Sequence, residues 1–397
     1  MTDGTLPARG VSAPKVAFFN NPKIRGTIFQ AIALGLLIFL AYRGISNAVT
    51  NLTNQRIAAG FGFLDNTAGF GISQTLIPWN EAMSYGRAFV VGLLNTLLVA
   101  VVGVFLATIL GFIVGVARLS RNWVIAKIAY WYVEIIRNLP LLFQILFWYL
   151  AVLATMPAPR DSISLFGELF INQRGITMPK PLFQPGAGWI GIGLIVGIVV
   201  AFAVRHWAHK RQDATGEQFP VVPTMWGLII GLPLLAYLAT GMPVSFDHPV
   251  QGRFNLQGGM TIIPEFVALL IALVAYTAAF IGEIVRAGIQ AVSHGQTEAG
   301  RSLGLQEGRI LNLIVIPQAL RVIIPPLTSQ YLNLAKNSSL AVGIGYPDMV
   351  SVGGTILNQT GQAIEIIAMW MGCYLTISII TSLFMNWYNR RIALVER

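Results

Sequence analysis

The sequence predicts an all-α integral membrane protein with eight transmembrane helices and with both termini in the cytoplasm. Composition and charge distribution predict this fold class. Hydrophobic residues make up 55% of the chain, charged residues only 11%, and the mean hydropathy is +0.67. Because soluble proteins carry about 25% charged residues, this chain has too few charges to cover a soluble fold. The composition therefore excludes a disordered chain, a nucleic-acid-binding protein and an ordinary cytosolic enzyme, and it requires contact with lipid.

Seven charge-poor segments have the length and composition of membrane crossings, since a helix needs about 20 residues to cross about 30 Å of hydrocarbon. They are residues 27–42, 88–117, 139–156, 189–204, 223–240, 262–281 and 366–385. The first segment is short, but Lys23, Arg25 and Arg43 flank it. Their long side chains can reach the headgroup region from positions inside the bilayer edge.

The basic residues orient the chain and require an eighth crossing. With a cytoplasmic N-terminus, most of the 26 lysines and arginines fall on the cytoplasmic side, as the positive-inside rule demands. A basic C-terminal tail on the same side then needs one more span, which we place at about residues 322–345. This stretch contains Pro325, Pro326, Asn333 and a polar cluster at 336–339. A span this polar must lie inside a bundle or line a cavity.

The chain divides into one large membrane domain and two flanking segments. Residues 1–87 hold a cytoplasmic N-terminal segment, the first transmembrane helix and an outer loop. Residues 88–387 hold the remaining crossings, and residues 388–397 form a basic cytoplasmic tail. The outer loops at 45–87 and 158–188 are rich in Gly, Pro, Asn and Thr, which favours solvated, irregular chain.

The cytoplasmic segment 282–321 has the pattern of two short helices joined by a tight turn. We expect a helix over residues 296–303 that ends at Gly304, and Leu311, Ile314 and Val315 recur with helical spacing after it. Together these residues, 296–315, form a projection that we call the knob. A rigid knob can transmit the movement of a partner protein, whereas a flexible loop cannot.

The knob resembles the docking loop of bacterial ABC importer permeases. Residues 298–300, then Gly304, then residues 314–317 fit the pattern E-A-A-x3-G-x9-I-x-L-P, with Gly300 in place of the second alanine and Ile316 in place of the leucine. The match continues through 317–321 and 324–327, and the cluster 336–341 resembles a lysine-led cluster of polar amino-acid uptake permeases. Two upstream segments, 134–142 and 283–288, resemble the E-x-x-R-G-x-P-L-L and E-I-V-R-A-G segments of that subfamily.

The resemblance covers about residues 85–391 with a break, and it implies the type-1 permease fold of ABC importers over residues 88–387. Residues 157–261 look inserted relative to the five-span form of the family, because they add a helical hairpin and long loops. This enlarged layout resembles the Q-type permease subunits of general L-amino-acid transport systems. We derive no role for the hairpin.

The resemblance implies a function and partners. The implied function is that of a permease subunit of an ATP-driven importer, which carries L-amino acids across the bacterial inner (plasma) membrane as a multi-pass protein. The implied partners are cytosolic ABC ATPase subunits, a second and related permease subunit, a periplasmic amino-acid-binding protein and the lipid bilayer, but no nucleic acid. We expect no cofactor on this chain. The sequence has no G-x-x-x-x-G-K-[ST] phosphate loop, so we expect the partner ATPase to use the ATP.

We expect coupling to the ATPase through the loop around residues 296–305, at the glycine turn of the knob, and most of the expected docking residues lie in this loop. The full set is Gln296, Thr297, Glu298, Ala299, Gly300, Gly304, Leu305 and Pro317. An ordinary helix–turn–helix between two spans is the alternative interpretation. Glu298 alone can also be a solvated carboxylate that the helix dipole favours.

Two further groups of residues each have two interpretations. Lys336, Asn337, Ser338 and Ser339 either line the translocation path or form a cluster that caps a helix end and reaches the headgroups. The E-I-x-R elements place an acid and a base at positions i and i+3, on one helix face. They either form ion pairs at the membrane boundary or act as a gate or substrate contact. Their charged residues are Glu134, Arg137, Glu283 and Arg286.

An ion-coupled secondary transporter of small polar solutes is the main alternative function. Its candidate proton-binding acids all lie near the ends of expected spans rather than at mid-membrane, which argues against it. These acids are Glu134, Glu265, Glu283 and Glu365. A membrane-embedded enzyme is a weaker alternative, because the chain has no G-x-S-x-G element. His206 and His209 lack further ligands nearby in the sequence, so we expect no metal site.

Overall fold

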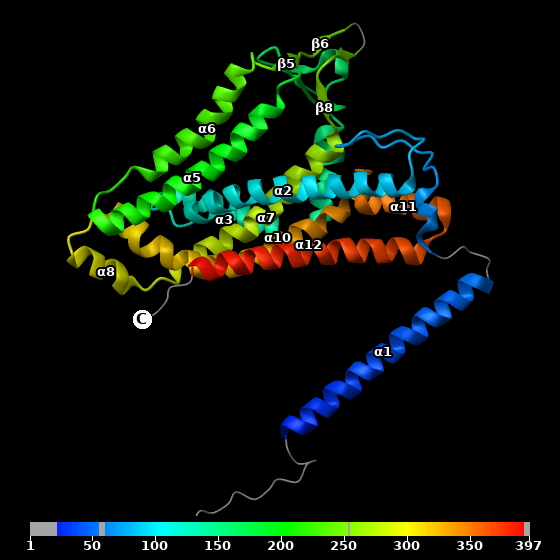
Figure 1. Cartoon of the computed structure of the whole chain (residues 1–397), viewed down its shortest axis with the longest axis horizontal. Helices are drawn as coiled ribbons and strands as arrows, with labels where there is room; N and C mark the ends of the chain where they lie inside the picture. The colour runs from blue at the N-terminus through cyan, green and yellow to red at the C-terminus, as the bar shows by residue number, and fades with distance from the viewer. Residues whose placement is uncertain (1–21, 55–59, 253–254, 393–397) are drawn as a thin grey trace, which may run out of the picture.

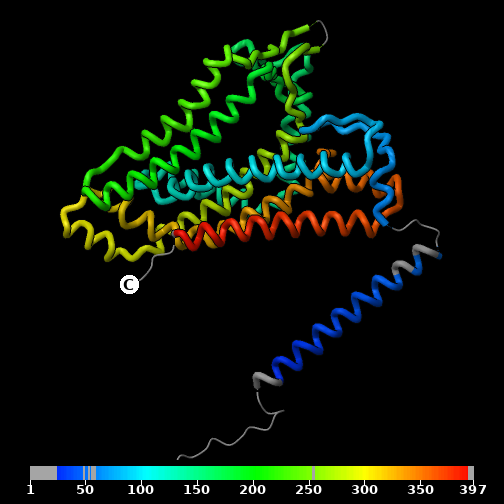
Figure 2. The backbone as a smooth tube through the Cα atoms, viewed as in Figure 1, coloured from blue at the N-terminus to red at the C-terminus, as the bar shows by residue number. Residues whose placement is uncertain are grey.

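The computed structural model describes residues 22–54, 60–252 and 255–392 and consists mostly of helices (Figures 1 and 2). Within these residues, seven helices are long and apolar enough to cross a membrane, and a bent helix pair makes up to eight crossings. The expected all-α membrane fold with eight crossings is therefore confirmed. The basic residues expected in the cytoplasmic ends at 1–21 and 393–397 lie outside the described residues.

The first helix stands apart from the rest of the molecule (Figure 1). Helix α1 (Pro22–Asn54) exposes apolar side chains such as Phe29, Leu37 and Ile38, each more than half exposed. A helix that is apolar all round and unpacked requires lipid as its solvent. The short 3₁₀ helix η2 (Phe61–Asp65) follows and packs against the start of α2 (Tyr85–Ala117).

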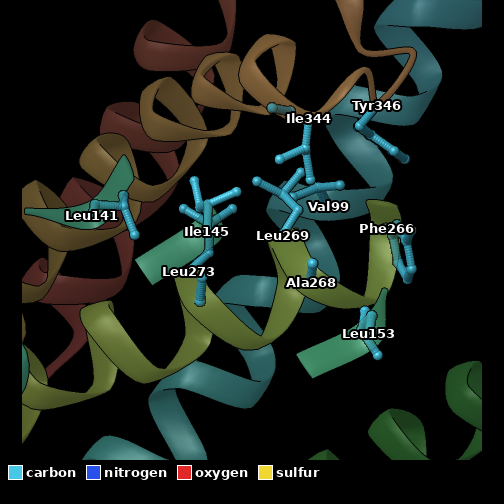
Figure 3. Packing of buried hydrophobic residues seen from close by; sticks show 12 residues of the cluster. Val99, Leu141, Ile145, Leu153, Phe266, Ala268, Leu269, Leu273, Ile344 and Tyr346 are labelled. Carbon is cyan, nitrogen blue, oxygen red and sulfur yellow. The ribbon is translucent and has the colours of Figure 1, made fainter. Parts of the chain in front are cut away.

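The core of the bundle forms where α2 packs against α7 (Pro264–Gln290). Two glycines of α2 make this close approach possible. A Cβ atom at Gly111 would lie 2.5 Å from the Cβ atom of Ile281, and one at Gly115 would lie 2.6 Å from that of Val285. Figure 3 shows how side chains of α7, including Leu269 and Phe266, meet those of the neighbouring helices.

The crossing expected at 139–156 has a different shape. Helix α3 (Trp123–Asn138) precedes it, and helix α4 (Leu141–Leu146), continued by the π-helix η3 (Phe147–Leu153), leaves at an angle of 107°. Pro140 explains the bend, because proline disfavours helical backbone in the residue before it. Leu139 accordingly adopts extended angles, with φ −96° and ψ 130°. The expected straight span is therefore corrected to a bent pair that begins at Trp123.

The loop expected at 158–188 is largely a small antiparallel sheet. After the 3₁₀ turn η4 (Pro159–Asp161), the sheet has the order β1-β2-β3-β8. Its strands are β1 (Ile163–Leu165), β2 (Leu169–Asn172), β3 (Gly175–Met178) and β8 (Met260–Ile262). Two further pairs are β4 (Lys180–Phe183) with β5 (Val244–Asp247), and β6 (Val250–Gln251) with β7 (Leu256–Gln257). The expectation of irregular chain was wrong here, since β3 pairs with a strand that follows a whole helical hairpin.

The helical hairpin between these strands packs mainly on itself. Helices α5 (Gly188–Thr215) and α6 (Val221–Ala239) approach closely because α5 carries glycines at the contact. A Cβ atom at Gly197 would lie 2.7 Å from the carbonyl oxygen of Leu228. Figure 1 shows the hairpin diverging from α2 towards the strands.

The C-terminal part contains the knob and the eighth crossing. Helix α8 (His294–Ser302) leads through a turn into α9 (Glu307–Ile310), the π-helix η5 (Leu311–Val315), α10 (Ile316–Asn337) and the 3₁₀ helix η6 (Ser338–Ile344). Residues 307–344 qualify as one span, which confirms the polar crossing expected at 322–345. Helix α11 (Met349–Thr360), which the sequence did not lead us to expect, packs beside α2, and α12 (Ala363–Ile392) ends the described chain.

Candidate functional site

The turn of the knob is a helix end that requires glycine. Gly304 has φ +71°, a conformation that L-residues with side chains rarely adopt. The amide of Gly304 donates to the carbonyl of Arg301 at 2.8 Å, and the amide of Leu305 donates to the carbonyl of Gly300 at 3.2 Å. These two bonds are the pair that closes a Schellman motif. The expected helix, its end and its glycine are confirmed.

A second glycine allows α8 to pack closely against the next helix. Gly300 is buried, and a Cβ atom there would lie 3.0 Å from Ile310 and 3.1 Å from Ile314. An alanine at this position would need its neighbours to give by a few tenths of an ångström, and a larger side chain would separate the helices. The knob is therefore a packed unit rather than a loop.

Charged side chains on the surface of the knob form an ion pair between its two halves. The Nε atom of Arg301 donates to the Oε1 atom of Glu307 at 2.7 Å, across the turn. This hydrogen bond raises the pKa of the Arg301 guanidinium above its already high usual value, so the group stays charged at any physiological pH. The ring of His294 lies 3.1 Å from the Oε1 atom of Glu298, one helical turn on.

Half of the eight residues expected to dock a partner, Gly304 among them, are exposed on the surface of the knob. Gln296, Glu298 and Ala299 are exposed, whereas Thr297, Leu305 and Pro317 are half-buried and Gly300 is buried. Sequence reasoning missed Leu303, whose side chain is 79% exposed beside the turn. The sequence feature that could have indicated this exposed side chain is a leucine directly before the glycine that ends the helix. Figure 1 places α8 at the same end of the molecule as the end of α12.

The span that contains the candidate translocation path has one exposed face, which is apolar in the first half of α10 and polar in the second half. From Val322 onward, its exposed residues recur every three or four positions along α10, and its opposite face is buried. The exposed residues are Ile316, Val322, Pro325, Pro326, Ser329, Asn333 and Lys336. We call Ser329, Asn333 and Lys336 the polar stripe. Sequence reasoning left Ser329 and Asn333 out of the site, although their spacing from Lys336 was the signal.

The four polar residues that the sequence singled out do not all belong to the stripe. The hydroxyl of Ser338 is buried and donates to the carbonyl of Ala335 at 2.8 Å, and that of Ser339 donates to the carbonyl of Lys336 at 2.8 Å. Both serines thus satisfy their own helix. Lys336 is exposed and Asn337 is half-buried, and neither side chain has a polar partner within the described residues.

The two E-I-x-R elements differ in structure. Glu283 accepts hydrogen bonds from Arg286, with the Nε atom at 3.1 Å, and also from Arg118 at the end of α2. Arg137 instead places its guanidinium 5.0 Å above the ring centre of Phe280. Across residues 22–54, 60–252 and 255–392, no ion pair joins Glu134 to Arg137. An ion pair between these two residues is therefore corrected to a cation–π contact of Arg137.

A buried polar cluster at the opposite end of the molecule was missed. Asp348, fully buried and outside the candidate spans, caps α11 by accepting from the amide of Ser351 at 2.8 Å. Thr96 accepts from the amide of Met349 at 3.0 Å, and Asn95 donates to the carbonyl of Pro347 at 2.9 Å. Burial raises the pKa of the Asp348 carboxyl to about 7. The sequence feature that could have indicated this cluster is the adjacent polar pair Asn95 and Thr96 within the uncharged stretch of α2.

Comparisons with known proteins agree on one family. The family described as "binding-protein-dependent transport system inner membrane component" matches residues 193–394. The chain is 52% identical to the general L-amino acid transport system permease protein AapQ of Rhizobium johnstonii, over 99% of this chain and 98% of that protein.

Two further relatives match over almost the whole chain. Identity is 52% to the putative amino-acid ABC transporter permease protein YhdX of Escherichia coli, over 96% of this chain and 97% of that protein. It is 41% to the glutamate/glutamine/aspartate/asparagine transport system permease protein BztB of Rhodobacter capsulatus, over 97% of this chain and 98% of that protein.

Proposed function

This chain belongs to the family of binding-protein-dependent transport system inner membrane components, and on that premise we propose that it is the permease subunit of an ATP-driven importer of L-amino acids. The names of the three relatives support the amino-acid substrate, since each describes amino-acid transport. The family's description supports a place in the bacterial inner membrane and a dependence on a separate binding protein.

The continuity of the knob with the candidate path carries the proposal. Residues 307–344 run as one helical span through α9, η5, α10 and η6. The knob occupies one end of this rod, and Lys336 of the polar stripe lies near the other end. A displacement of the knob therefore has a continuous helical element along which to reach the polar stripe.

In the mechanism, residues 307–344 act as a lever that transmits movement from the knob to the polar stripe. A cytosolic ATPase binds the knob at the exposed side chains of Gln296, Glu298 and Ala299, while Gly300 and Gly304 keep the knob rigid. ATP is bound by that ATPase, and this chain binds no cofactor of its own. When ATP binding closes the ATPase, the knob moves and α10 tilts with it. The energy reaches the path only because the two states differ in their contacts at the knob.

A second permease subunit completes the translocation path. The polar stripe of α10 is exposed on the single chain, yet polar side chains within a span are costly to expose to lipid, by about 2.5–3.5 kcal/mol for a lysine at the helix centre on insertion scales. A related permease chain therefore covers this face, and Lys336 and Asn337 line the water-filled path between the two subunits. A substrate carboxylate can pair there with the Lys336 ammonium.

The outer end of the molecule receives the loaded periplasmic binding protein. The end opposite the knob carries α11 (Figure 1), and the buried polar cluster joins the start of α11 to α2. When that end is open, the binding protein releases its amino acid into the translocation path. Glu283, held between Arg118 and Arg286, acts in this scheme as a structural ion pair at the inner boundary.

Co-purification from the native host tests the proposal. We expect an ATPase with a phosphate-binding loop to accompany the wild-type chain and to be lost from Glu298→Lys and from Gly304→Val. Glu298→Lys reverses an exposed charge, and Gly304→Val puts a branched side chain at φ +71°. An ATPase retained by both variants would move the docking site elsewhere. The absence of any ATPase with an intact wild-type preparation would favour an ion-coupled secondary transporter.

Matched controls separate docking from folding. Gly216, the residue after α5, has φ +74° and open space around it. Gly216→Val therefore imposes the same backbone strain at a residue outside the knob. Asp213→Lys reverses an exposed acidic charge on the same helix. Both controls should keep the ATPase bound, and a loss with either would show that the effect is not specific to the knob.

A further inference from the structure

A cationic pocket lies at the inner ends of α2, α3 and α7, and none of its lining residues belongs to the knob or the polar stripe. Its volume is about 310 Å³. Its lining combines three cations with two aromatic side chains and an amide: Arg118, Lys127, Arg286, Trp123, Tyr130 and Gln290. The function proposed above uses only the Glu283 ion pairs at its edge. The pocket itself remains without a role.

The charges of this pocket do not balance within the chain. Glu283 accepts from both Arg118 and Arg286, so a single carboxylate serves two guanidinium groups. Lys127 makes no ion pair with any described residue. Its Nζ atom lies 5.2 Å from the ring centre of Tyr130 and 5.5 Å from that of Trp131. Three cations against one carboxylate leave a net positive site that is suited to an anion.

The helix α3 adds to the attraction for an anion. Trp123, Ala126, Lys127 and Tyr130 line the pocket at positions i, i+3, i+4 and i+7 of this 16-residue helix, which places them on one face of its first two turns. The N-terminal end of a helix carries a partial positive charge. The cationic side chains and the start of α3 therefore act on the same volume.

The pocket lies at the depth of the lipid headgroups. No charged residue occurs between Arg87 and Arg118 along α2, or between Glu265 and Glu283 along α7. Both hydrocarbon-spanning segments thus end at the pocket. Next to it, α3 exposes Val124, Ile125 and Ile128, each about half exposed or more. Trp and Tyr beside basic residues are the side chains expected at this interface.

We propose that this pocket binds the phosphate group of an anionic phospholipid from the adjacent leaflet. The phosphate lies between Lys127 and the two arginines, and the acyl chains extend along the exposed apolar face of α3. Basic pockets between transmembrane helices on the cytoplasmic side are known to hold such headgroups. A neutral zwitterionic lipid lacks the net charge that the three cations select.

Native mass spectrometry of the full-length protein, purified with the subunits that accompany it, tests this site. After delipidation, phosphatidylglycerol or phosphatidylcholine with the same acyl chains is added back at increasing concentration. We expect at least one phosphatidylglycerol to bind in preference to phosphatidylcholine. Lys127→Gln should weaken that binding about fivefold, which corresponds to the ~1 kcal/mol of one basic residue near an anionic surface.

Two controls decide the interpretation. Lys210→Gln removes an exposed lysine near the end of α5, on another helix, and should leave the preference for phosphatidylglycerol unchanged. Equal binding of the two lipids, or an equal loss in the two lysine variants, would overturn the proposal. Displacement of the lipid by millimolar inorganic phosphate would also overturn it, because the pocket would then be a site for a free anion.

Discussion

Single residues control the backbone of this protein where side chains cannot fit or cannot be solvated. Gly304 ends α8 in a left-handed conformation, and Gly300 allows α8 to touch Ile310. Asp348 is an acid buried beside α11, where it caps the helix through one oxygen while its Oδ2 atom has no hydrogen-bond partner. These residues act through conformation and burial.

Asparagine at position 304 should be tolerated better than valine. A left-handed conformation costs an ordinary L-residue about 1–2 kcal/mol, but asparagine adopts it more readily than other side chains. We expect Gly304→Asn to keep most amino-acid uptake in membrane vesicles and Gly304→Val to lose most of it, with equal amounts of both variants in the membrane. Equal uptake by both would contradict the role of backbone strain at this turn.

The stability of the protein should depend on pH through Asp348. Burial raises the pKa of Asp348 in the folded protein to about 7, against an ordinary value of 3.8. Between these two pH values the folded state therefore holds a proton that the unfolded state has lost. The free energy of unfolding therefore falls as pH rises from about 4 to 7. Between pH 5 and 8 we expect Asp348→Asn to remove on the order of 2 kcal/mol of this pH dependence, measured as the shift in Tm in detergent. An unchanged slope would exclude Asp348 as the titrating group.

Helices act in this molecule as packed pairs and as a lever. Small residues decide the pairs, since α2 approaches α7 at Gly111 and Gly115, and α5 approaches α6 at Gly197. The lever is the run from α9 through η6, whose one face is buried against the bundle while the polar stripe stays exposed. A bundle with close backbone contacts provides the fixed part against which such a lever moves.

A leucine at Gly111 should prevent the α2–α7 contact from forming. The Cβ atom would lie 2.5 Å from the Cβ atom of Ile281, and overpacking of this kind typically costs 1–3 kcal/mol or more. We expect Gly111→Leu to lower the Tm of the detergent-solubilised protein or to reduce its accumulation in the membrane. Gly35→Leu on α1, where a Cβ atom meets nothing within 4 Å, should behave as the wild type. Equal stability of the two variants would argue against the close contact.

At the scale of the whole molecule, the single chain leaves surfaces that only an assembly or a membrane can cover. The polar stripe is too polar for lipid, whereas α1 and the outer faces of α5 and α6 are apolar and suit it. The knob lies at one end and α11 lies at the other (Figure 1). The cationic pocket is lined by residues at the ends of α2 and α7, and α7 is the helix that leads into the knob. The two ends thus differ in the partners that they can receive.

Cross-linking should capture the second permease at the polar stripe. In a Cys373→Ser background, which removes the single cysteine of the chain, we expect Asn333→Cys to react with a bifunctional thiol–amine reagent and to join a second permease subunit. Ile38→Cys on the exposed surface of α1 is the control that lipid should protect. A cross-link from Ile38→Cys but none from Asn333→Cys would place the subunit interface elsewhere.

The amino-acid sequence by itself determined the membrane fold, the number of crossings and the knob with its terminal glycine. These features depend on local signals: apolar runs, the distribution of basic residues and the requirement for glycine at a left-handed helix end. The tertiary structure alone decided which face of α10 is exposed, where Asp348 is buried and how β3 pairs with β8. Those features depend on contacts between residues far apart in the chain, and local composition carries no information on which distant segment supplies the partner.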